Sequence, residues 1–428
     1  MQITRRHLLT AAGGLAATAA LSACGSNNGL TNNSGSSSSA SAGGSKPTLA
    51  QWYHQYGEAG TKEAVNKYAA SYPDATVNVT WYAGNYDTAV PAALLTNSFP
   101  DVFEYGNGPT LDMIKGGQVV DMTDVLGSSV SKFNQSVIKR LTFQGKIWAV
   151  PQVIDMQLLY YRPSLLKKAG VQPPTTFSAL VDAAKAQTTK DMGGFFAGND
   201  GGVGVLGNMF VWASGFDQLN SGRTGLGFLE PNFYDSLKAY QAFYKSNALL
   251  KSASKDWFDA SPFINGETAM QWGGLWSMPD VQKAFGNDFG VLAFPAMGSS
   301  GRPAVPFGAY SSCVAAKSKN VDAAKAFVKW LWVDQTADQV DFANSYGTHI
   351  PSQVALVPQC TKIAQGPGKD AADMVAKEGF ASDIMWTGPI GDAFNSAMTN
   401  VIVKGADPAS EFKPVGDKAV SELKRING

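Results

Sequence analysis

The chain has 428 residues, and its 34 Lys and Arg balance 34 Asp and Glu, so the formal net charge is zero. This balance argues against nucleic acid or an anionic membrane surface as the main partner. The 10 Trp, 14 Tyr and 23 Phe are mostly expected in cores, but they also supply rings from which a stacking site can be built.

The first 24 residues predict an export signal. Arg5 and Arg6 form a twin-arginine pair, and a short Gly/Ala-rich apolar run follows. This run is too short for a membrane span, and its flanks are those of a cleavable signal. The ending Leu21-Ser22-Ala23-Cys24 resembles a lipobox, in which Cys24 is diacylated. We therefore expect residues 1–24 to be a twin-arginine lipoprotein signal peptide, although an ordinary secretory signal with a chance cysteine is the alternative.

This interpretation predicts that the folded part of the chain, after residue 46, is held at the membrane by a lipid anchor. Two acyl chains on Cys24 give stable anchoring, here to the outer face of the cell membrane. Residues 25–46 are rich in Gly, Ser, Asn and Thr without periodicity, so we expect a disordered linker spanning roughly 25 Å. The remaining residues, about 380, exceed what one hydrophobic core usually holds, which predicts two lobes.

The opening of the body alternates strands and helices. Such an order predicts a mostly parallel α/β sheet with ligands at the carboxyl ends of its strands. Hydrophobic periodicity places these elements at Pro47–Trp52 (strand), Thr61–Tyr72 (helix), Val77–Trp81 (strand), Asp87–Asn97 (helix) and Asp101–Tyr105 (strand).

The segment Leu141–Pro163 differs from its surroundings. A turn at residues 144–146 precedes an extended apolar segment that ends at Val150-Pro151, and Gln157–Tyr161 forms a second extended run. Proline cannot donate to a sheet ladder, so Pro151 fits a strand edge or a crossing between sheets. Asp155 is a lone carboxylate between the two runs.

The rest of the chain predicts further helices, strands and one loop. The expected elements are a helix from Phe177 capped by Thr175 or Thr176, a flexible Gly-rich loop at Gly198–Gly207, a helix at Asp235–Lys245, an apolar strand at Phe289–Pro295, a helix capped by Asn320, and a helix from Pro389 that ends before Gly405.

Several of these stretches resemble one family. The Gly145–Pro151 element with its following strand, Phe99–Phe103, and above all Phe263–Met270 followed by Gly274-Leu275-Trp276 are similar to extracytoplasmic sugar-binding proteins of ABC importers (family 1 extracellular solute-binding proteins, which include maltose-binding protein). The resemblance covers nearly all of residues 47–428. It implies an α/β, two-lobed periplasmic-binding-protein fold of type II, with a ligand cleft between the lobes.

The same resemblance implies a division of the chain. Three hinge crossings are expected near residues 152–158, 305–311 and 347–352. Lobe 1 would then comprise 47–154 and 308–350, and lobe 2 would comprise 155–307 and 351–428.

Function and site residues follow from the resemblance. A monomer would bind a mono- or oligosaccharide by hinge closure, without a cofactor, and deliver it to the transmembrane subunits of an ABC permease. Trp276 would stack on the sugar, Asp155 would accept hydroxyl hydrogen bonds, and the other candidate ligand-binding residues are Tyr105, Asn107, Trp52, His54, Gln55, Trp212, Trp272, Tyr310, His349 and Trp386. The helix start Pro389–Asp392 departs from the maltose-binding pattern, so the sugar is not identified.

Other motifs argue weakly for other functions. Gly202–Gly207 matches G-x-G-x-x-G, but Asp217 comes too early for the acidic residue of a dinucleotide site. No Walker sequence, G-x-S-x-G or H-E-x-x-H is present. His54 and His349 are the only histidines outside the leader, too few for a His-rich zinc site, so no metal is expected.

Two other function classes remain open. A secreted carbohydrate-active enzyme needs two carboxylates across a sugar. Asp101 with Glu104, and Asp121 with Asp124, fit loop or cap roles better, and no second carboxylate partners Asp155, so we predict no catalysis. A protein of the same fold could instead bind a polyamine, a peptide or an iron chelate.

Cys313 and Cys360 remain after Cys24. They could form a disulfide in an oxidising compartment, but spacing alone cannot decide their distance.

Overall fold

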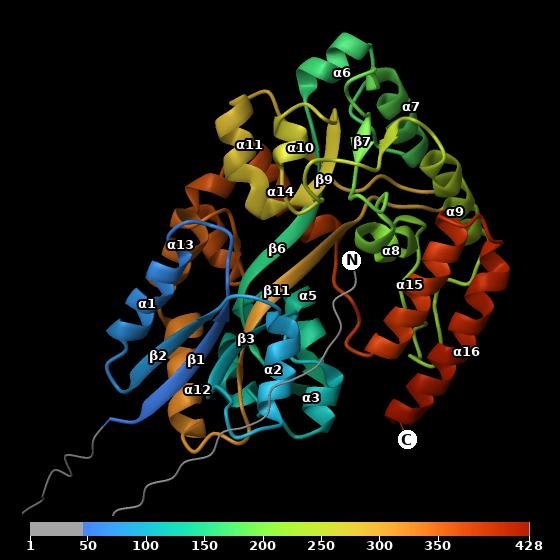
Figure 1. Ribbon diagram of the computed structural model, residues 1–428. Helices are drawn as coiled ribbons and strands as arrows, with labels where there is room; N and C mark the ends of the chain where they lie inside the picture. The colour runs from blue at the N-terminus through green and yellow to red at the C-terminus, as the bar shows by residue number, and fades with distance from the viewer. Residues whose placement is uncertain (1–45, 428) are drawn as a thin grey trace, which may run out of the picture. The chain divides into compact units, whose positions relative to one another are not determined.

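Two groups of strands share one long central strand in this fold. The computed structural model describes residues 46–427 (Figure 1). The predicted signal peptide, Cys24 and almost all of the predicted linker lie outside the described residues. The strands are β1 Thr48–His54, β2 Thr76–Tyr82, β3 Val102–Gly106, β4 Thr142–Phe143, β5 Lys146–Ile147, β6 Val150–Tyr161, β7 Phe195–Phe196, β8 Leu249–Leu250, β9 Met270–Gly274, β10 Gly290–Leu292, β11 Val305–Val314, β12 Ile350–Pro351 and β13 Gly379–Phe380.

Helices cover both ends of this sheet (Figure 1). They are α1 Thr61–Ser71, α2 Tyr86–Leu94, α3 Leu111–Lys115, α4 Thr123–Leu126, α5 Gln135–Leu141, α6 Pro163–Ala169, α7 Phe177–Gln187, α8 Val203–Ala213, α9 Pro231–Tyr244, α10 Ser261–Ile264, α11 Met278–Phe285, α12 Val321–Lys329, α13 Thr336–Ser345, α14 Gly366–Glu378, α15 Gly388–Ile402 and α16 Pro408–Asn427. Short helical turns lie at Gly127–Lys132, Leu275–Ser277, Trp330–Asp334, Val354–Gln359 and Thr361–Ile363.

The predicted parallel opening is confirmed. The main sheet has the order β2-β1-β3-β11-β6-β9-β7-β8, and β1 is parallel to both β2 and β3. At the other end, β7 is parallel to β8 and β9. The central strands differ, because β11 runs antiparallel to β3 and to β6, and β6 runs antiparallel to β9.

Strand β6 corrects the predicted break after Pro151. Residues 150–161 form one continuous strand, with Pro151 as its second residue. The register between β6 and β11 shifts between Pro151 and Val153, so the missing N–H of Pro151 falls at an interruption of the ladder. The residues Val150–Met156 pair with β11, and Gln157–Tyr161 pair with β9.

The three predicted crossings lie side by side. Ile154 of β6 faces Ala309 of β11 on one side and Ile350 of β12 on the other. In Figure 1, β6 and β11 run together between the group of β1, β2 and β3 and the group of β7 and β9. The strands that connect the two groups therefore form a narrow ladder, while the lobe boundaries given above stay a prediction.

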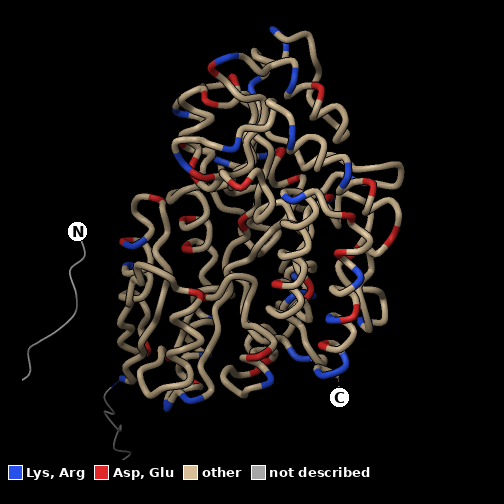
Figure 2. The backbone as a smooth tube through the Cα atoms, turned by 45° about the vertical axis from the view of Figure 1, so that its right-hand side comes forward, with Lys and Arg blue, Asp and Glu red and all other residues tan. Residues whose placement is uncertain are grey.

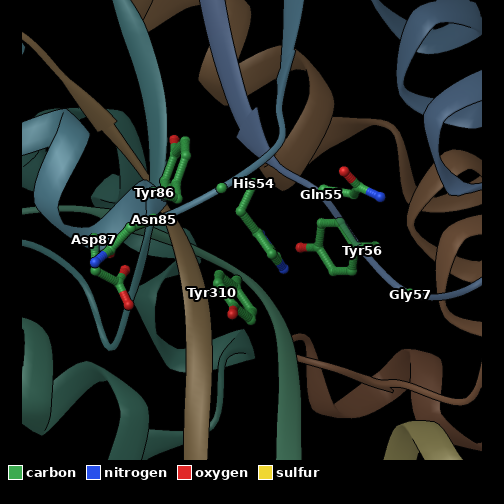
Figure 3. A pocket seen from close by; sticks show the side chains of 9 residues that line it. His54, Gln55, Tyr56, Gly57, Asn85, Tyr86, Asp87 and Tyr310 are labelled. Carbon is green, nitrogen blue, oxygen red and sulfur yellow. The ribbon is translucent and has the colours of Figure 1, made fainter. Parts of the chain in front are cut away.

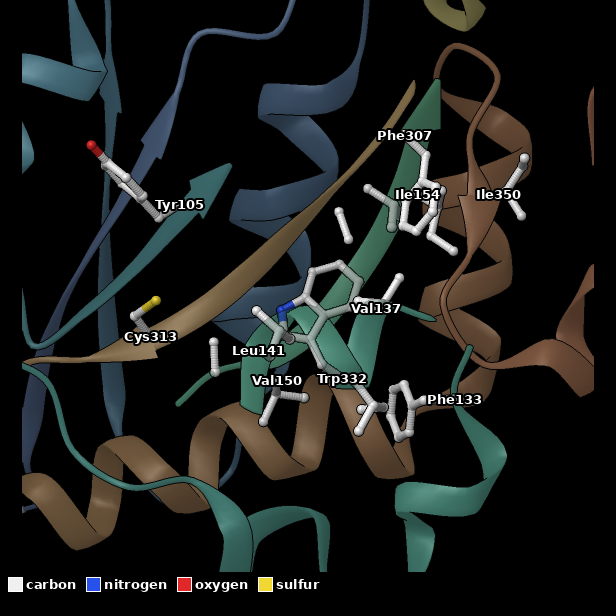
Figure 4. Packing of buried hydrophobic residues seen from close by; sticks show 14 of the residues in the cluster. Tyr105, Phe133, Val137, Leu141, Val150, Ile154, Phe307, Cys313, Trp332 and Ile350 are labelled. Carbon is white, nitrogen blue, oxygen red and sulfur yellow. The ribbon is translucent and has the colours of Figure 1, made fainter. Parts of the chain in front are cut away.

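Two buried clusters hold the elements together. The first runs from the β1–β3 end along β6 and β11 to Phe263 and Leu275. Within it, the Trp332 indole lies among Val137, Leu141 and Val150 (Figure 4). The second cluster gathers around Phe210, Phe294 and Phe394, and joins α8 to α15.

The glycine run at 198–207 was predicted to be a flexible loop, and that prediction is wrong from Val203 onward. Helix α8 begins there, with Gly202 at a φ of 84° before it. The Asp200 carboxylate accepts hydrogen bonds from the N–H groups of Gly202 and Gly204, both at 2.8 Å. Gly207 packs against Phe394, since an added Cβ would lie 3.1 Å from that ring. The glycines therefore serve a close helix contact.

One capping expectation is corrected, one open question is answered and one cap is confirmed. Asn320 precedes α12, but its side chain makes no capping hydrogen bond and donates instead to the Thr48 carbonyl oxygen at 3.3 Å. Cys313 and Cys360 are both buried free thiols, so no disulfide joins them. Thr176 does cap α7, because its hydroxyl oxygen accepts from the Ala179 N–H at 3.2 Å.

Charged residues of both signs are interspersed over the fold. Figure 2 shows blue and red segments alternating on the visible elements, without a face of one sign in that view. Within residues 46–427, no helix combines the length and the apolar character needed to cross a membrane.

Candidate functional site

Three adjoining cavities lie where β1 and β3 end and beside β6 and β11. Their volumes are about 390, 300 and 870 Å³. Tyr310 lines all three, and Asp155 and Trp276 line the two of about 300 and 870 Å³. We call the three cavities together the cleft. The carboxyl ends of the parallel strands thus open into it, as is usual in α/β folds.

Aromatic rings form one wall of the cleft. The His54 ring stacks on Tyr310 with centroids 4.3 Å apart and an angle of 11°, and its centroid is 3.9 Å from that of Tyr56 (Figure 3). Tyr86 is anchored by its hydroxyl, which donates to the carbonyl oxygens of Trp52 and Glu104 at 3.0 and 2.9 Å. These rings are fixed by one another before any ligand arrives.

A buried carboxylate orders this wall. Glu104, on β3, accepts a hydrogen bond from the His54 N–H at 2.9 Å, and its Oε1 also contacts His54 Nδ1. Its Oε2 accepts from the Tyr56 hydroxyl at 2.8 Å. Burial disfavours the charged form of His54, but the charge and hydrogen bond of Glu104 outweigh it, so the pKa of His54 is raised. Glu104 therefore holds the rings of His54 and Tyr56 in place.

A second histidine–carboxylate pair lies at the crossing strands. His349 Nδ1 is 2.7 Å from Asp155 Oδ1, and His349 Nε2 is 3.4 Å from Glu58 Oε1. His349 is buried, which disfavours its charged form, yet Asp155 first and Glu58 second raise its pKa. The pKa of Glu58 is raised mainly by burial. Within residues 46–427, no hydrogen-bond donor reaches Asp155 Oδ2, which leaves this oxygen available to a ligand.

Trp276 owes its position to the glycine two residues before it. Its Nε1 donates to the Phe258 carbonyl oxygen at 2.9 Å. The indole folds back over Gly274, where an added Cβ would lie 2.2 Å from the ring. Trp257 meets it edge-on at 6.0 Å. The Gly-x-Trp spacing thus presents one ring to the cleft.

Asn107 ends β3 in a left-handed conformation, with a φ of 63°. Its side-chain oxygen accepts from the Ala309 N–H at 3.3 Å, and its own N–H donates to the Ala309 carbonyl oxygen at 3.0 Å. A non-glycine residue in this region is uncommon and frequently belongs to a site. Asn107 joins β3 to β11 at the edge of the cleft.

The structure brings most of the predicted site residues together. Those that line the cleft are Trp276, Asp155, Asn107, His54, Gln55, Trp212, Tyr310 and His349. Their contact with a ligand stays a prediction.

Four predicted residues lie outside the cleft. Trp272 is fully buried, donates its Nε1 to Gln157 Oε1 at 2.9 Å and packs edge-on against Phe294. Trp386 packs against Phe394, Trp52 against Tyr82, and the Tyr105 hydroxyl donates to the Asp87 carbonyl oxygen at 2.9 Å. Strand alternation explains Trp272, whose neighbours along β9 face the opposite side.

Sequence reasoning missed several acidic and polar residues. Glu58, Asp259 and Asp280 line the largest cavity together with Asp155, so the expectation of a lone carboxylate is wrong. Glu58 belongs to the polar-aromatic loop after the first strand, and that placement was the available signal. The amides of Gln157 and Asn208 were also missed. In the described part of the chain, no group of three or more His, Cys, Asp or Glu side chains has the arrangement of a metal site.

Comparison with known proteins decides the family. The family model of the bacterial extracellular solute-binding proteins matches residues 51–335. This chain belongs to that family. The predicted recognition is therefore confirmed.

Characterised relatives have low identity. The diacetylchitobiose-binding protein DasA of Streptomyces coelicolor is 24% identical over 338 residues, which are 76% of this chain and 77% of the relative. The maltodextrin-binding protein MdxE of Bacillus subtilis is 28% identical over 250 residues, or 53% and 56% of the two chains.

Solved structures agree on the fold. The acarbose-binding GacH receptor of Streptomyces glaucescens superposes with a TM-score of 0.74 at 22% identity, over 89% of this chain and 99% of GacH. A cycloalternan-bound substrate-binding protein of Listeria monocytogenes gives 0.74 at 20%, over 89% and 99%. The predicted two-lobed, type II periplasmic-binding-protein fold is confirmed. Proteins of this family are extracellular, and they bind solutes for transport.

Replacing Asp155 with Asn is predicted to flatten the fall of stability above about pH 6.5. A folded-state pKa raised at His349 gives stability that is complete below the unfolded value, near 6.5, and is lost as pH rises through the folded value. Asn removes the group that raises this pKa most. Thermal unfolding from about pH 6 to 9 measures the slope.

Asp87→Asn is the control, because Asp87 lines the cleft without bonding a histidine. Asp155 also contributes to the raised pKa of His54, after Glu104, so part of the flattening in Asp155→Asn will come from His54. An Asp155→Asn variant with the full wild-type slope would show that this pair does not titrate as described.

Proposed function

We propose that this protein is the solute-binding component of an ABC importer, and that its solute is a carbohydrate. The observation that carries the proposal is that one cleft is lined both by aromatic rings and by polar groups with unused hydrogen-bonding capacity. Trp276 and Tyr310 offer faces to the apolar side of a sugar, and Asp155 Oδ2 is an open acceptor for hydroxyls. The names of DasA, MdxE and the acarbose receptor GacH support the same class of ligand.

Neutral ligands suit this cleft better than cationic ones. A polyamine would need several unpaired carboxylates around an aromatic box. Among the described residues, five acidic side chains line the cleft, but Glu58 and Asp155 both face His349, and Asp259 already accepts from the N–H and hydroxyl of Ser261. The other two, Asp87 and Asp280, line different cavities, and Lys362 adds a positive charge to the larger one, which Asp280 lines. Charge-assisted hydrogen bonds to hydroxyls contribute about 1.5–3 kcal/mol each, which lets such a site reject the wrong epimer.

Hinge closure at the crossing strands is the proposed mechanism. Within residues 46–427, only β6, β11 and the short β12 run together at Ile154, so few backbone dihedrals need to change when the two ends rotate. The pair of Asp155 and His349 joins β6 to the approach of β12. A ligand that contacts both ends stabilises the closed form by its differential affinity for that form. The permease would then bind the closed form of the protein and receive the sugar unaltered.

A thermal-shift screen against mono- and oligosaccharides tests the proposal. At least one sugar should raise the melting temperature and be recovered intact after incubation. Release of a product would indicate an enzyme, and the absence of any shift across the panel would contradict a sugar ligand.

Trp276→Ala is predicted to weaken binding of that sugar by about 30-fold or more, because a stacking hot spot is lost. Unfolding should stay cooperative. Trp148→Ala is the matched control, since Trp148 is also half-buried and also donates Nε1 to a carbonyl oxygen, that of Phe143, but lies outside the cleft. Equal calorimetric affinities for the wild type and Trp276→Ala would remove Trp276 from the site.

Gly274→Ala is predicted to weaken binding on the order of tenfold by displacing the indole. The φ of Gly274 is −97°, which alanine adopts freely, so the effect is steric and confined to the ring. In a Trp276→Ala background the second change should add little. Additive losses in this cycle would argue against a shared cause.

Export by the twin-arginine route and lipid anchoring at Cys24 are part of the proposal, supported by the leader sequence. Cys24→Ser is predicted to move the protein from the membrane fraction to the medium, because the acylated thiol is lost. Immunoblots of the two fractions measure this. Retention of the variant in the membrane fraction would contradict the anchor.

A further inference from the structure

A fourth cavity adjoins the cleft and differs from it in charge. Its volume is about 630 Å³, and it shares Trp212, Phe380 and Ser382 with the cleft. Trp212 and Phe380 stack with centroids 5.6 Å apart. The two spaces therefore meet at these residues.

Four cationic side chains line this fourth cavity against two acidic ones. Each acid is already paired with an arginine, because Arg302 lies 3.0 Å from Asp217 and Arg223 lies 3.0 Å from Asp383. Arg302 also sits over the Phe380 ring at 4.4 Å. The remaining cations, Lys139 and Arg140, come from α5. We call this space the basic cavity.

Arg140 is the unusual member of the basic cavity. The side chain is half-buried, and its Nε and Nη1 atoms are fully buried without a hydrogen-bond partner among residues 46–427. Burial lowers the pKa of Arg140 to about 10, which leaves the guanidinium charged at neutral pH. An unpaired charge in such a place is costly, and an anion that enters the cavity would supply the missing counter-charge.

We propose that the basic cavity receives an anionic substituent of the carbohydrate held in the cleft: a carboxylate, sulfate or phosphate group that Arg140 binds. This inference rests on the carbohydrate function proposed above. All three groups carry the negative charge that Arg140 lacks as a partner, and Lys139 adds a further positive charge. A neutral sugar would leave the Arg140 guanidinium without a counter-charge.

Isothermal calorimetry of the mature chain tests the inference with matched sugars. The probes are neutral di- to tetrasaccharides and their counterparts that carry one uronic acid, one sulfate or one phosphate. At least one charged form should bind on the order of tenfold more tightly than its neutral counterpart, and rising salt should reduce the difference. Arg140→Gln should remove this preference and leave the neutral sugar unchanged.

Two variants keep the test sharp. Arg425→Gln removes an exposed guanidinium that pairs with Glu422 on α16, and should leave the preference intact. Arg140→Lys keeps the positive charge, so it should keep at least part of the preference. If Arg140→Gln fails to fold, the salt dependence of the wild type and the Arg140→Lys result decide.

The outcomes separate the two proposals. If no sugar of either kind binds, the proposed function fails, and this inference fails with it. If neutral and charged sugars bind equally, or if Arg140→Gln weakens both alike, only the inference is overturned. Binding of inorganic phosphate or sulfate, with no preference among the sugars, would overturn it as well.

Discussion

The backbone pairing of β6 is the constraint on which the structure depends. One half of this strand pairs with β11 and β12, and the other half pairs with β9 and β10. Each end of the molecule therefore uses its own part of one twelve-residue strand to complete its sheet. Asp155 is the last residue but one of β6 that pairs with β11, and pairing with β9 begins two residues later, at Gln157. A site at this junction contacts both ends without any additional connecting element.

Two buried histidine–carboxylate pairs organise the chemistry around that junction. Glu104 holds His54 against Tyr310, and Asp155 holds His349 while Glu58 faces the other ring nitrogen. Buried charges are tolerated when they are paired in this way. Glu104 is fully used in this way, whereas Asp155 keeps Oδ2 open to a ligand. What remains is a set of ring faces and a few open acceptors, which is the surface that a polyol needs.

The cleft and the basic cavity adjoin but differ in electrostatics. Trp212 and Phe380 line both, and Arg302 lies over the Phe380 ring. In the cleft, acidic groups meet histidines, whereas in the basic cavity arginines outnumber their acidic partners. Under the proposals above, the cleft would contact the sugar rings and the basic cavity would contact a charged substituent. Selectivity would then depend on ligand charge as well as on hydroxyl geometry.

Local patterns in the sequence determined the parallel opening, the capped α7, the crossing segment and the prominence of Trp276 and Asp155, because periodicity, caps and short motifs act over a few residues. Only the tertiary structure decided the rest. Whether a tryptophan faces the core or the cleft depends on strand register and packing. Trp272 and Trp386 were therefore candidates from the sequence, and only the packing around β9 and α15 shows that they lie outside the cleft. Glu58, Asp155 and His349 meet from three distant parts of the chain, and Arg140 lines one cavity with Trp212. No local pattern in the sequence records such contacts. The glycine run was predicted to be a loop but forms part of helix α8, because the contact of Gly207 with Phe394 exists only when α8 and α15 pack together.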